Sequence, residues 1–96
     1  MLIDRGFKTN DTVTIKLSSG EELIARFVSE DDRAYKVSTP LALGDTGQGI
    51  GMYPYLISAG KDRDVPFTKS LVVSIILTDE VFSKSYQANT SKIQVV

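Results

Sequence analysis

The sequence contains no cysteine and no histidine, and each absence narrows the chemistry open to it. Without cysteine, the chain can form neither a disulfide nor a thiolate metal site, which fits a reducing compartment. Without histidine, it lacks the commonest general base and the commonest metal ligand. Catalysis would then depend on carboxylates, lysine, tyrosine or a serine–lysine pair. We therefore predict a protein that is not an enzyme and that holds no metal ion and no cofactor.

The chain also lacks a charge excess and a long apolar run. Its 11 lysines and arginines are balanced by 12 aspartates and glutamates, for a net charge of -1. A basic patch for nucleic acid would therefore have to be local. No apolar run approaches the roughly 20 residues that span a bilayer. The N-terminal segment 1–11, MLIDRGFKTND, carries charges where a signal peptide has its apolar core. We expect a cytoplasmic protein that does not bind a membrane.

Ninety-six residues suffice for one domain with a single core. Residues 12–17 and 21–29 both alternate apolar and polar side chains, as half-buried strands do. Between them, Gly20 can supply the positive φ of a hairpin turn. The EDDR stretch at 30–33 predicts a second tight turn, because aspartate side chains bond the nearby backbone. Three residues of the second strand should share one face: Leu23, Ala25 and Phe27.

Three further strands are predicted, at 34–38, 50–57 and 71–77, with loops at 44–49 and 58–64 between them. Pro40 should end or bend the first of these, and Pro54 should place the second at an edge or a bulge. The strand at 71–77 is apolar on nearly both faces, so both faces should be covered. One cover would be the barrel interior. The other would be either a helix of the same chain or another subunit.

The C-terminal part predicts a short helix at 78–88, followed by a tail at 89–96 that is either a sixth strand or a disordered end. Thr78 can cap the helix, and the acidic residues after it favour the positive end of the helix dipole. Phe82 and Tyr86 lie on one helical face. Five short strands within 12–77 favour a mainly β fold, a small, strongly bent open barrel of the Sm-like or SH3-like kind.

The stretch from Val13 to Val37 resembles the first Sm motif of the Sm/LSm proteins and of bacterial Hfq. That motif has an apolar strand ending in leucine, then two residues, then glycine, and Leu17 and Gly20 match it. Apolar residues follow at the third and seventh positions after the glycine, where this chain has Leu23 and Phe27. The resemblance covers about a quarter of the chain and predicts an Sm-like domain.

The later positions of the motif are matched in part. Its aspartate coincides with Asp31 without a gap, whereas Ala25 stands where glycine is usual and Tyr35 where asparagine is usual. The second Sm motif closes on Arg-Gly, and here Gly60 has the position while Lys61 follows it. A C-terminal helix also departs from the family, whose helix is at the amino end. The chain is therefore similar to a divergent member, and it also resembles small Sm-like proteins of phage and metagenomic origin, for which the location would be the host cytoplasm.

The resemblance implies a homo-oligomeric ring of about five to seven subunits, in which the strand at 50–57 of one subunit pairs with the strand at 71–77 of the next. It also implies that single-stranded nucleic acid, with RNA favoured over DNA, is bound near the pore. Five positions of this sequence would then carry the contacts: Asp31, Arg33, Tyr35, Lys61 and Arg63. Tyr35 can stack on a base, and Arg33 can stack or pair with a phosphate.

Plainer interpretations of the same residues stay open. The acidic residues at 30–32 are typical of a solvated turn, and 61–64 of an exposed charged loop. Tyr35 can equally pack against Phe27 or a neighbouring subunit, and the aromatic pair around Pro54 favours interface packing. The alternative function is a structural or adaptor ring that binds only protein, for example in a viral complex.

Overall fold

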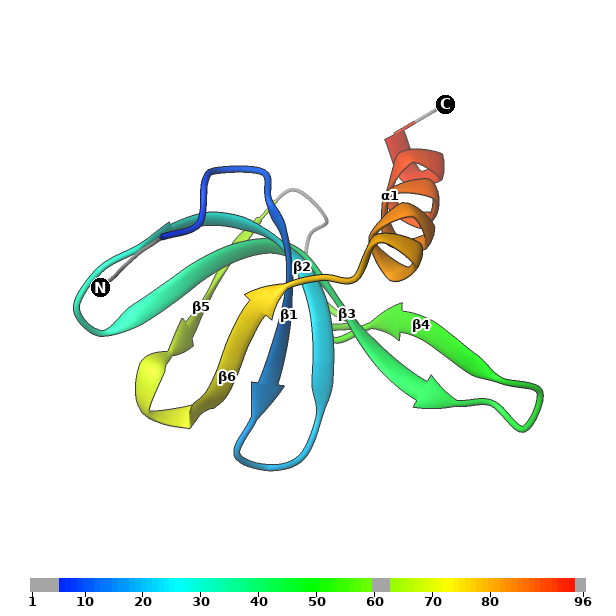
Figure 1. The fold of residues 1–96 in the computed structure, drawn as a ribbon, viewed down its shortest axis with the longest axis horizontal. Helices are drawn as coiled ribbons and strands as arrows, with labels where there is room; N and C mark the ends of the chain where they lie inside the picture. The colour runs from blue at the N-terminus through cyan, green and yellow to red at the C-terminus, as the bar shows by residue number, and fades with distance from the viewer. Residues whose placement is uncertain (1–5, 60–62, 95–96) are drawn as a thin grey trace.

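The computed structural model describes residues 6–59 and 63–94, which form one open antiparallel sheet and one C-terminal helix (Figure 1). Within these residues the structure has six strands: β1 (Thr12–Leu17), β2 (Glu22–Glu30), β3 (Ala34–Asp45), β4 (Ile50–Pro54), β5 (Asp64–Thr68) and β6 (Val72–Leu77). The 3₁₀ turn η1 (Lys69–Leu71) joins β5 to β6, and the helix is α1 (Glu80–Gln94). The strand order is β4-β3-β2-β1-β6, and β5 pairs with β3. The predicted mainly β, strongly bent fold is thus confirmed, with six strands rather than five.

The first hairpin forms as its alternation predicts. β1 and β2 pair antiparallel with Val13 opposite Ala25, and Gly20 takes a φ of 111° in the turn between them. The predicted inner face of β2 is buried and joins β1 in the main core. That core consists of Val13, Ile15, Leu17, Leu23, Ala25, Phe27, Val37, Ala42 and Phe67. The hairpin therefore supplies most of the apolar interior.

β3 does not end at Ser38 as predicted but continues through Pro40 to Asp45. Ile24 pairs with Leu41 and Arg26 with Ser38, so Ala25 stands opposite two residues, Thr39 and Pro40. This bulge holds Thr39 at a φ of 48°, a conformation that bends the strand. Pro40 thus bends the strand, and Ala25, fully buried opposite the bulge, supplies the small side chain that such a bend requires.

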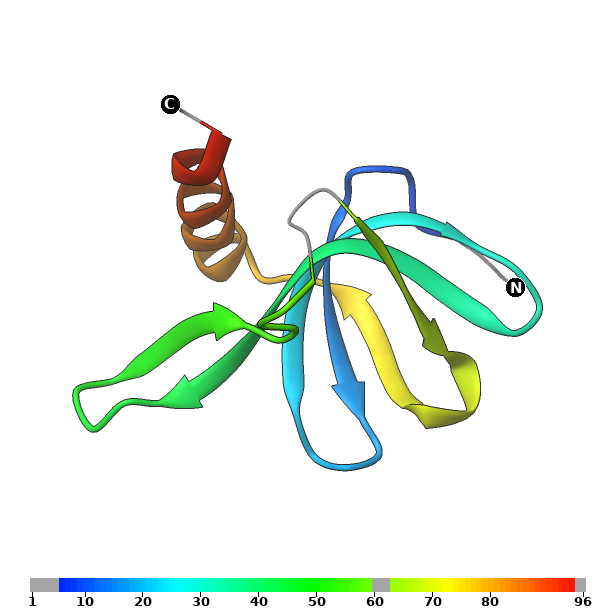
Figure 2. The same ribbon diagram turned by 180° about the vertical axis from the view of Figure 1, so that it is seen from behind.

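The bend lets β3 hold two partners along one edge. Residues before it pair with β5, with Ala34 opposite Thr68, and residues after it pair with β4. The second half of β3 and β4 form a hairpin arm that projects from the rest of the sheet, as seen from both sides (Figures 1 and 2). β4 ends at Pro54, three residues before the predicted end of that strand.

β5 was not predicted, because Asp64–Thr68 is short and contains a proline. Pro66 lies opposite Lys36 in the only pairing that β5 makes among the described residues. An edge strand tolerates proline, since the missing N–H would face away from the ladder. The last residue of the predicted loop at 58–64 therefore already belongs to β5.

α1 packs on the outer face of the sheet rather than over β6. Tyr86 is fully buried against Ile24 and Leu41, and its hydroxyl donates to the Thr39 carbonyl at 2.8 Å. Burial raises the pKa of Tyr86 to about 12, so the phenol remains a donor at neutral pH. Arg26 adds a second contact, with its guanidinium 5.6 Å from the centre of the Tyr86 ring.

The helix differs from the prediction at both ends. Asp79, not Thr78, caps it, because the Asp79 carboxylate accepts a hydrogen bond from the Val81 N–H at 3.1 Å. The Thr78 hydroxyl instead bonds the Thr14 hydroxyl. At the other end the helix extends to Gln94, through most of the predicted tail. None of the helices in the described ranges is long and apolar enough to cross a membrane.

The helix does not cover β6, and apolar side chains on both of its faces stay exposed, Ile76 on one and Leu77 on the other. Among the residues that the structure describes, β6 pairs with β1 along one edge only, and its Ile75 packs against the main core. Val73, Ile76 and Leu77 are exposed to 66%, 61% and 59%. The expectation that both faces of 71–77 are covered is therefore not met within the single chain. The chain's own helix, one of the two predicted covers, does not lie over β6.

Replacing Tyr86 should show how strongly α1 is anchored. We expect Tyr86→Phe to lower the free energy of unfolding by about 1 kcal/mol, because the partly buried hydrogen bond from the Tyr86 hydroxyl to the Thr39 carbonyl is lost. Tyr86→Ala should cost roughly 3 kcal/mol or more, since it also leaves a cavity. Val81→Ala, at an exposed position of the same helix, should stay within about 0.5 kcal/mol of the unchanged protein. Urea unfolding measures all three, and equal costs at both positions would contradict the anchoring role.

Candidate nucleic-acid interface at the β2–β3 turn

The β2–β3 turn is built by the side chain of Asp31. Its Oδ1 accepts hydrogen bonds from the backbone N–H groups of Arg33 at 2.8 Å and Ala34 at 2.9 Å. The Asp31 N–H in turn donates to the Ala34 carbonyl at 3.0 Å. The two bonds to the carboxylate, from Arg33 first and then Ala34, lower the pKa of Asp31 from its ordinary value of 3.8. The predicted role of Asp31 in ordering this turn is confirmed.

The ordered turn presents Arg33 to solvent. The residue is exposed, and its backbone carbonyl accepts a hydrogen bond from the Lys69 N–H at 2.7 Å. The backbone of Arg33 is therefore held on both sides, by Asp31 and by η1. A guanidinium on such a fixed base is suited to a phosphate or a base face.

Tyr35 lies partly in the core, next to the turn. It packs against the main apolar cluster. Its cross-strand partners are Phe67 on β5, which belongs to that cluster, and Glu30 on β2, which is exposed. The ammonium group of Lys69 lies 4.9 Å from the centre of its ring, and the same group pairs with the Glu30 carboxylate at 2.7 Å. In the single chain Tyr35 therefore packs against the core, as the plainer interpretation predicts, and Lys69 lies over one face of its ring. Base stacking by Tyr35 stays a prediction.

Lys69 is a residue of this site that the sequence analysis missed. The hydrogen bond to Glu30, above all, raises the pKa of Lys69 from its ordinary value of 10.5. Lys69 lies at the turn because Ala34 pairs with Thr68, and no local sequence pattern predicts that pairing. Lys36 also lies close enough for its positive charge to help lower the pKa of Asp31.

Arg63 lies at the other end of β5 from this turn. Arg63 comes directly before Asp64, which pairs with Ser38 of β3. Ser38 lies four residues along β3 from Ala34, which is next to the turn. Four residues of strand span roughly 14 Å. The structure therefore brings Asp31, Arg33 and Tyr35 together but not Arg63, which lines a separate depression with Leu56 and Pro66. Lys61 lies outside the described residues.

The charges around the turn are mixed. Cations and carboxylates alternate over a small surface: Arg33, Lys36 and Lys69 with Glu30, Asp31 and Asp32. Across the described ranges, no three potential ligands are grouped as a metal site requires. The arrangement can pair with anions through Arg33, while its carboxylates weaken the positive field around that side chain.

Comparison with known proteins adds no relative to this picture. No protein-family model matches the chain, and no curated protein matches it significantly.

The Asp31 turn should make stability depend on acid pH. Because folding lowers the pKa of Asp31, its contribution is fully present above pH 3.8 and is lost as the pH falls through the lowered value. Asp31→Asn keeps an accepting oxygen but cannot titrate. We expect the urea midpoint to fall less between pH 7 and pH 3 in this variant than in the unchanged protein. Asp32→Asn, in the same turn, is the matched control and should retain the larger fall; equal falls in both variants would contradict the assignment.

Proposed function

We propose that the chain is an Sm-like barrel subunit that assembles into a homo-oligomeric ring and binds single-stranded nucleic acid, with RNA favoured, without catalysing a reaction. The main support for the proposed assembly is that β6 is an edge strand whose apolar side chains are exposed. The exposed Arg33, on the turn that Asp31 orders, supports the binding site. The first-Sm-motif spacing through Leu17, Gly20 and Asp31 supports both parts.

The assembly follows from the edges of the open sheet. Within 6–59 and 63–94, β6 has one edge without a partner strand, and it exposes Val73, Ile76 and Leu77 in place of the charged side chains that usually protect such strands. β4 stands at the opposite end of the strand order, and in the same ranges β5 pairs with β3 alone. Pairing of β6 with β4 or β5 of the next copy would satisfy two edges with one head-to-tail contact. Repeated around an axis, such a contact closes a ring.

A ring would also change the electrostatics. Each copy repeats the same exposed cations around one axis, so a subunit with a net charge of -1 can still present a positive rim. Arg33 and Arg63, which lie at opposite ends of β5, would each be repeated around that axis. Phosphate contacts at such a rim need no basic excess in the subunit as a whole.

The charges favour one second candidate, a structural or adaptor ring that binds only protein, for example in a viral complex. Glu30, Asp31 and Asp32 lie beside Arg33, and Lys69 already pairs with Glu30. A polyanion would meet these carboxylates as it approached the turn. Assembly through β6 is common to both candidates, and only the bound partner separates them.

Light scattering tests the assembly. We expect the unchanged protein to have several times the mass of one chain, and Ile76→Lys to reduce that mass, because a charge on the edge strand opposes pairing. Ser85→Lys adds the same charge at an exposed position of α1 and should leave the mass unchanged. A single-chain mass for the unchanged protein at high concentration would refute the ring for both candidates.

Fluorescence anisotropy with labelled oligo-U and oligo-A at two salt concentrations tests the binding. We expect an affinity that falls with salt, and Arg33→Ala should weaken it by roughly tenfold and flatten the salt dependence, since the loss is repeated in every subunit. Lys84→Ala removes an exposed cation of α1 and is the matched control. Absent or salt-independent binding at micromolar protein contradicts the nucleic-acid site.

A triple variant, Arg33→Ala with Lys61→Ala and Arg63→Ala, separates the two candidates. A nucleic-acid ring should lose binding and remain assembled. If the triple variant keeps all of its nucleic-acid affinity, these cations are not the site. If the unchanged ring binds no nucleic acid at all, the protein-only candidate is favoured.

A further inference from the structure

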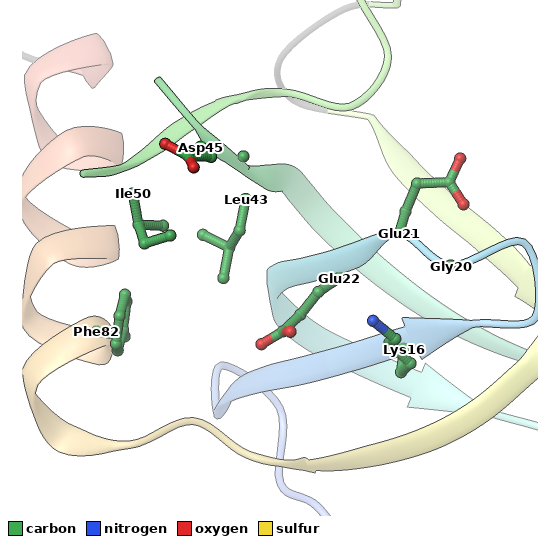
Figure 3. A pocket seen from close by; sticks show the side chains of 9 residues that line it. Lys16, Gly20, Glu21, Glu22, Leu43, Asp45, Ile50 and Phe82 are labelled. Atoms are coloured by element: carbon green, nitrogen blue, oxygen red, sulfur yellow. The ribbon is translucent and has the colours of Figure 1, made fainter. Parts of the chain in front are cut away.

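The outer face of the sheet carries a groove between the start of α1 and the hairpin arm (Figure 3). Phe82 of α1 forms one wall, Leu43 of β3 and Ile50 of β4 form another, and residues of β1 and β2 complete it. The groove has a volume of about 410 Å³, within the roughly 300–1,000 Å³ of typical binding pockets. It lies away from the β2–β3 turn, and its lining residues are not members of the main core.

The apolar part of the groove is a continuation of the small core under α1. Leu43 packs against the cluster of Ile24, Leu41 and Tyr86 that anchors the helix. Beyond it, Ile50 is exposed to 60% and Phe82 to 38%. Tyr86 fixes α1, and with it Phe82, against the sheet, and Leu43 of the other wall packs against the same cluster, so these parts of the two walls are held in place without a ligand. Covering Ile50 and Phe82 would remove apolar surface from water at little cost in ordering.

The polar part of the groove is acidic. Three carboxylates line it, those of Glu21, Glu22 and Asp45, and Lys16 is the cation among the described lining residues. Lys16 and Glu22 are cross-strand partners on the outer face of the sheet, which leaves Glu21 and Asp45 as the excess negative charge. Figure 3 shows Glu22 reaching toward the apolar wall formed by Leu43. A nucleic acid or an acidic peptide would be repelled, whereas a cationic one would be attracted.

We propose that this groove binds a peptide segment of a partner protein in which one or two large apolar side chains are flanked by lysine or arginine. The apolar side chains lie between Phe82 and Ile50, and the flanking cations meet Glu21, Glu22 and Asp45. This contact is independent of the β2–β3 turn. It gives the protein a protein-binding face in addition to the proposed nucleic-acid rim.

The probe is a short fluorescein-labelled peptide with a Leu-Phe pair between lysines, titrated with the full chain. Two comparison peptides replace the lysines by glutamates or the Leu-Phe pair by serines. We expect the first peptide to bind at least about tenfold more tightly than either comparison peptide. Its affinity should also fall with salt, because charge attraction across the rim is screened.

Matched variants locate the contact. Ile50→Ser should weaken binding by about tenfold, while Ile57→Ser, an even more exposed isoleucine outside the groove, should leave it unchanged. Glu21→Gln combined with Glu22→Gln should weaken binding and flatten its salt dependence. Circular dichroism verifies that each variant is folded, and both isoleucines are exposed, so loss of the fold is not expected.

Three outcomes overturn the proposal: no binding of the basic peptide at millimolar concentration, equal binding of the acidic peptide, or equal effects of Ile50→Ser and Ile57→Ser. Arg33→Ala should not change peptide affinity. A failure of this groove would therefore leave the nucleic-acid proposal intact, and a failure of that proposal would leave the groove intact.

Discussion

The bulge in β3 at Thr39 and Pro40 is the constraint on which the rest of the structure depends. A straight strand of this length could not hold β5 along its first half and carry the β4 arm away from the body along its second half. The backbone reaches the required turn only with Thr39 at a positive φ, which is unfavourable for a β-branched residue. Two contacts offset that strain. Ala25 leaves room on the partner strand, and Tyr86 donates to the Thr39 carbonyl from the helix above.

The same bend distributes the surfaces of the molecule. Because α1 is anchored over β2 and β3, it does not also cover β6, and several apolar residues of β6 stay exposed. Because the arm projects beside the start of α1, a groove opens between Phe82 and Ile50. The turn between β2 and β3 lies away from the groove and is bonded to η1, which leads into β6. Three separate faces are thereby available, each with its own chemistry: an apolar edge, an acidic groove and a turn bearing an exposed arginine.

The sequence could predict the features that depend on contacts between residues close together in the chain. It could not predict those that depend on pairing between distant segments. The two strands of the first hairpin, the buried face of β2 and the Asp31 turn are set by alternation and by short-range hydrogen bonds, and the predictions for them were confirmed. β5 was missed, because five residues with a proline carry too little local signal and only pairing with β3 makes them a strand. The candidate site was predicted in part: Asp31, Arg33 and Tyr35 are neighbours by sequence, whereas Lys69 joins them and Arg63 leaves them only through the β3–β5 register.

The sequence by itself determined the composition of the interior, the absence of histidine and cysteine chemistry, and the strands whose side chains alternate. Those properties follow from residue identity and from contacts within a few positions. The tertiary structure decided the rest: that Pro40 bends β3 instead of ending it, that the helix covers β2 and β3, and that β6 is left with an open edge. Each of these depends on which of several apolar surfaces meet. That choice is made by packing between segments far apart in the chain, such as Tyr86 against Ile24 and Leu41, and no local pattern encodes it.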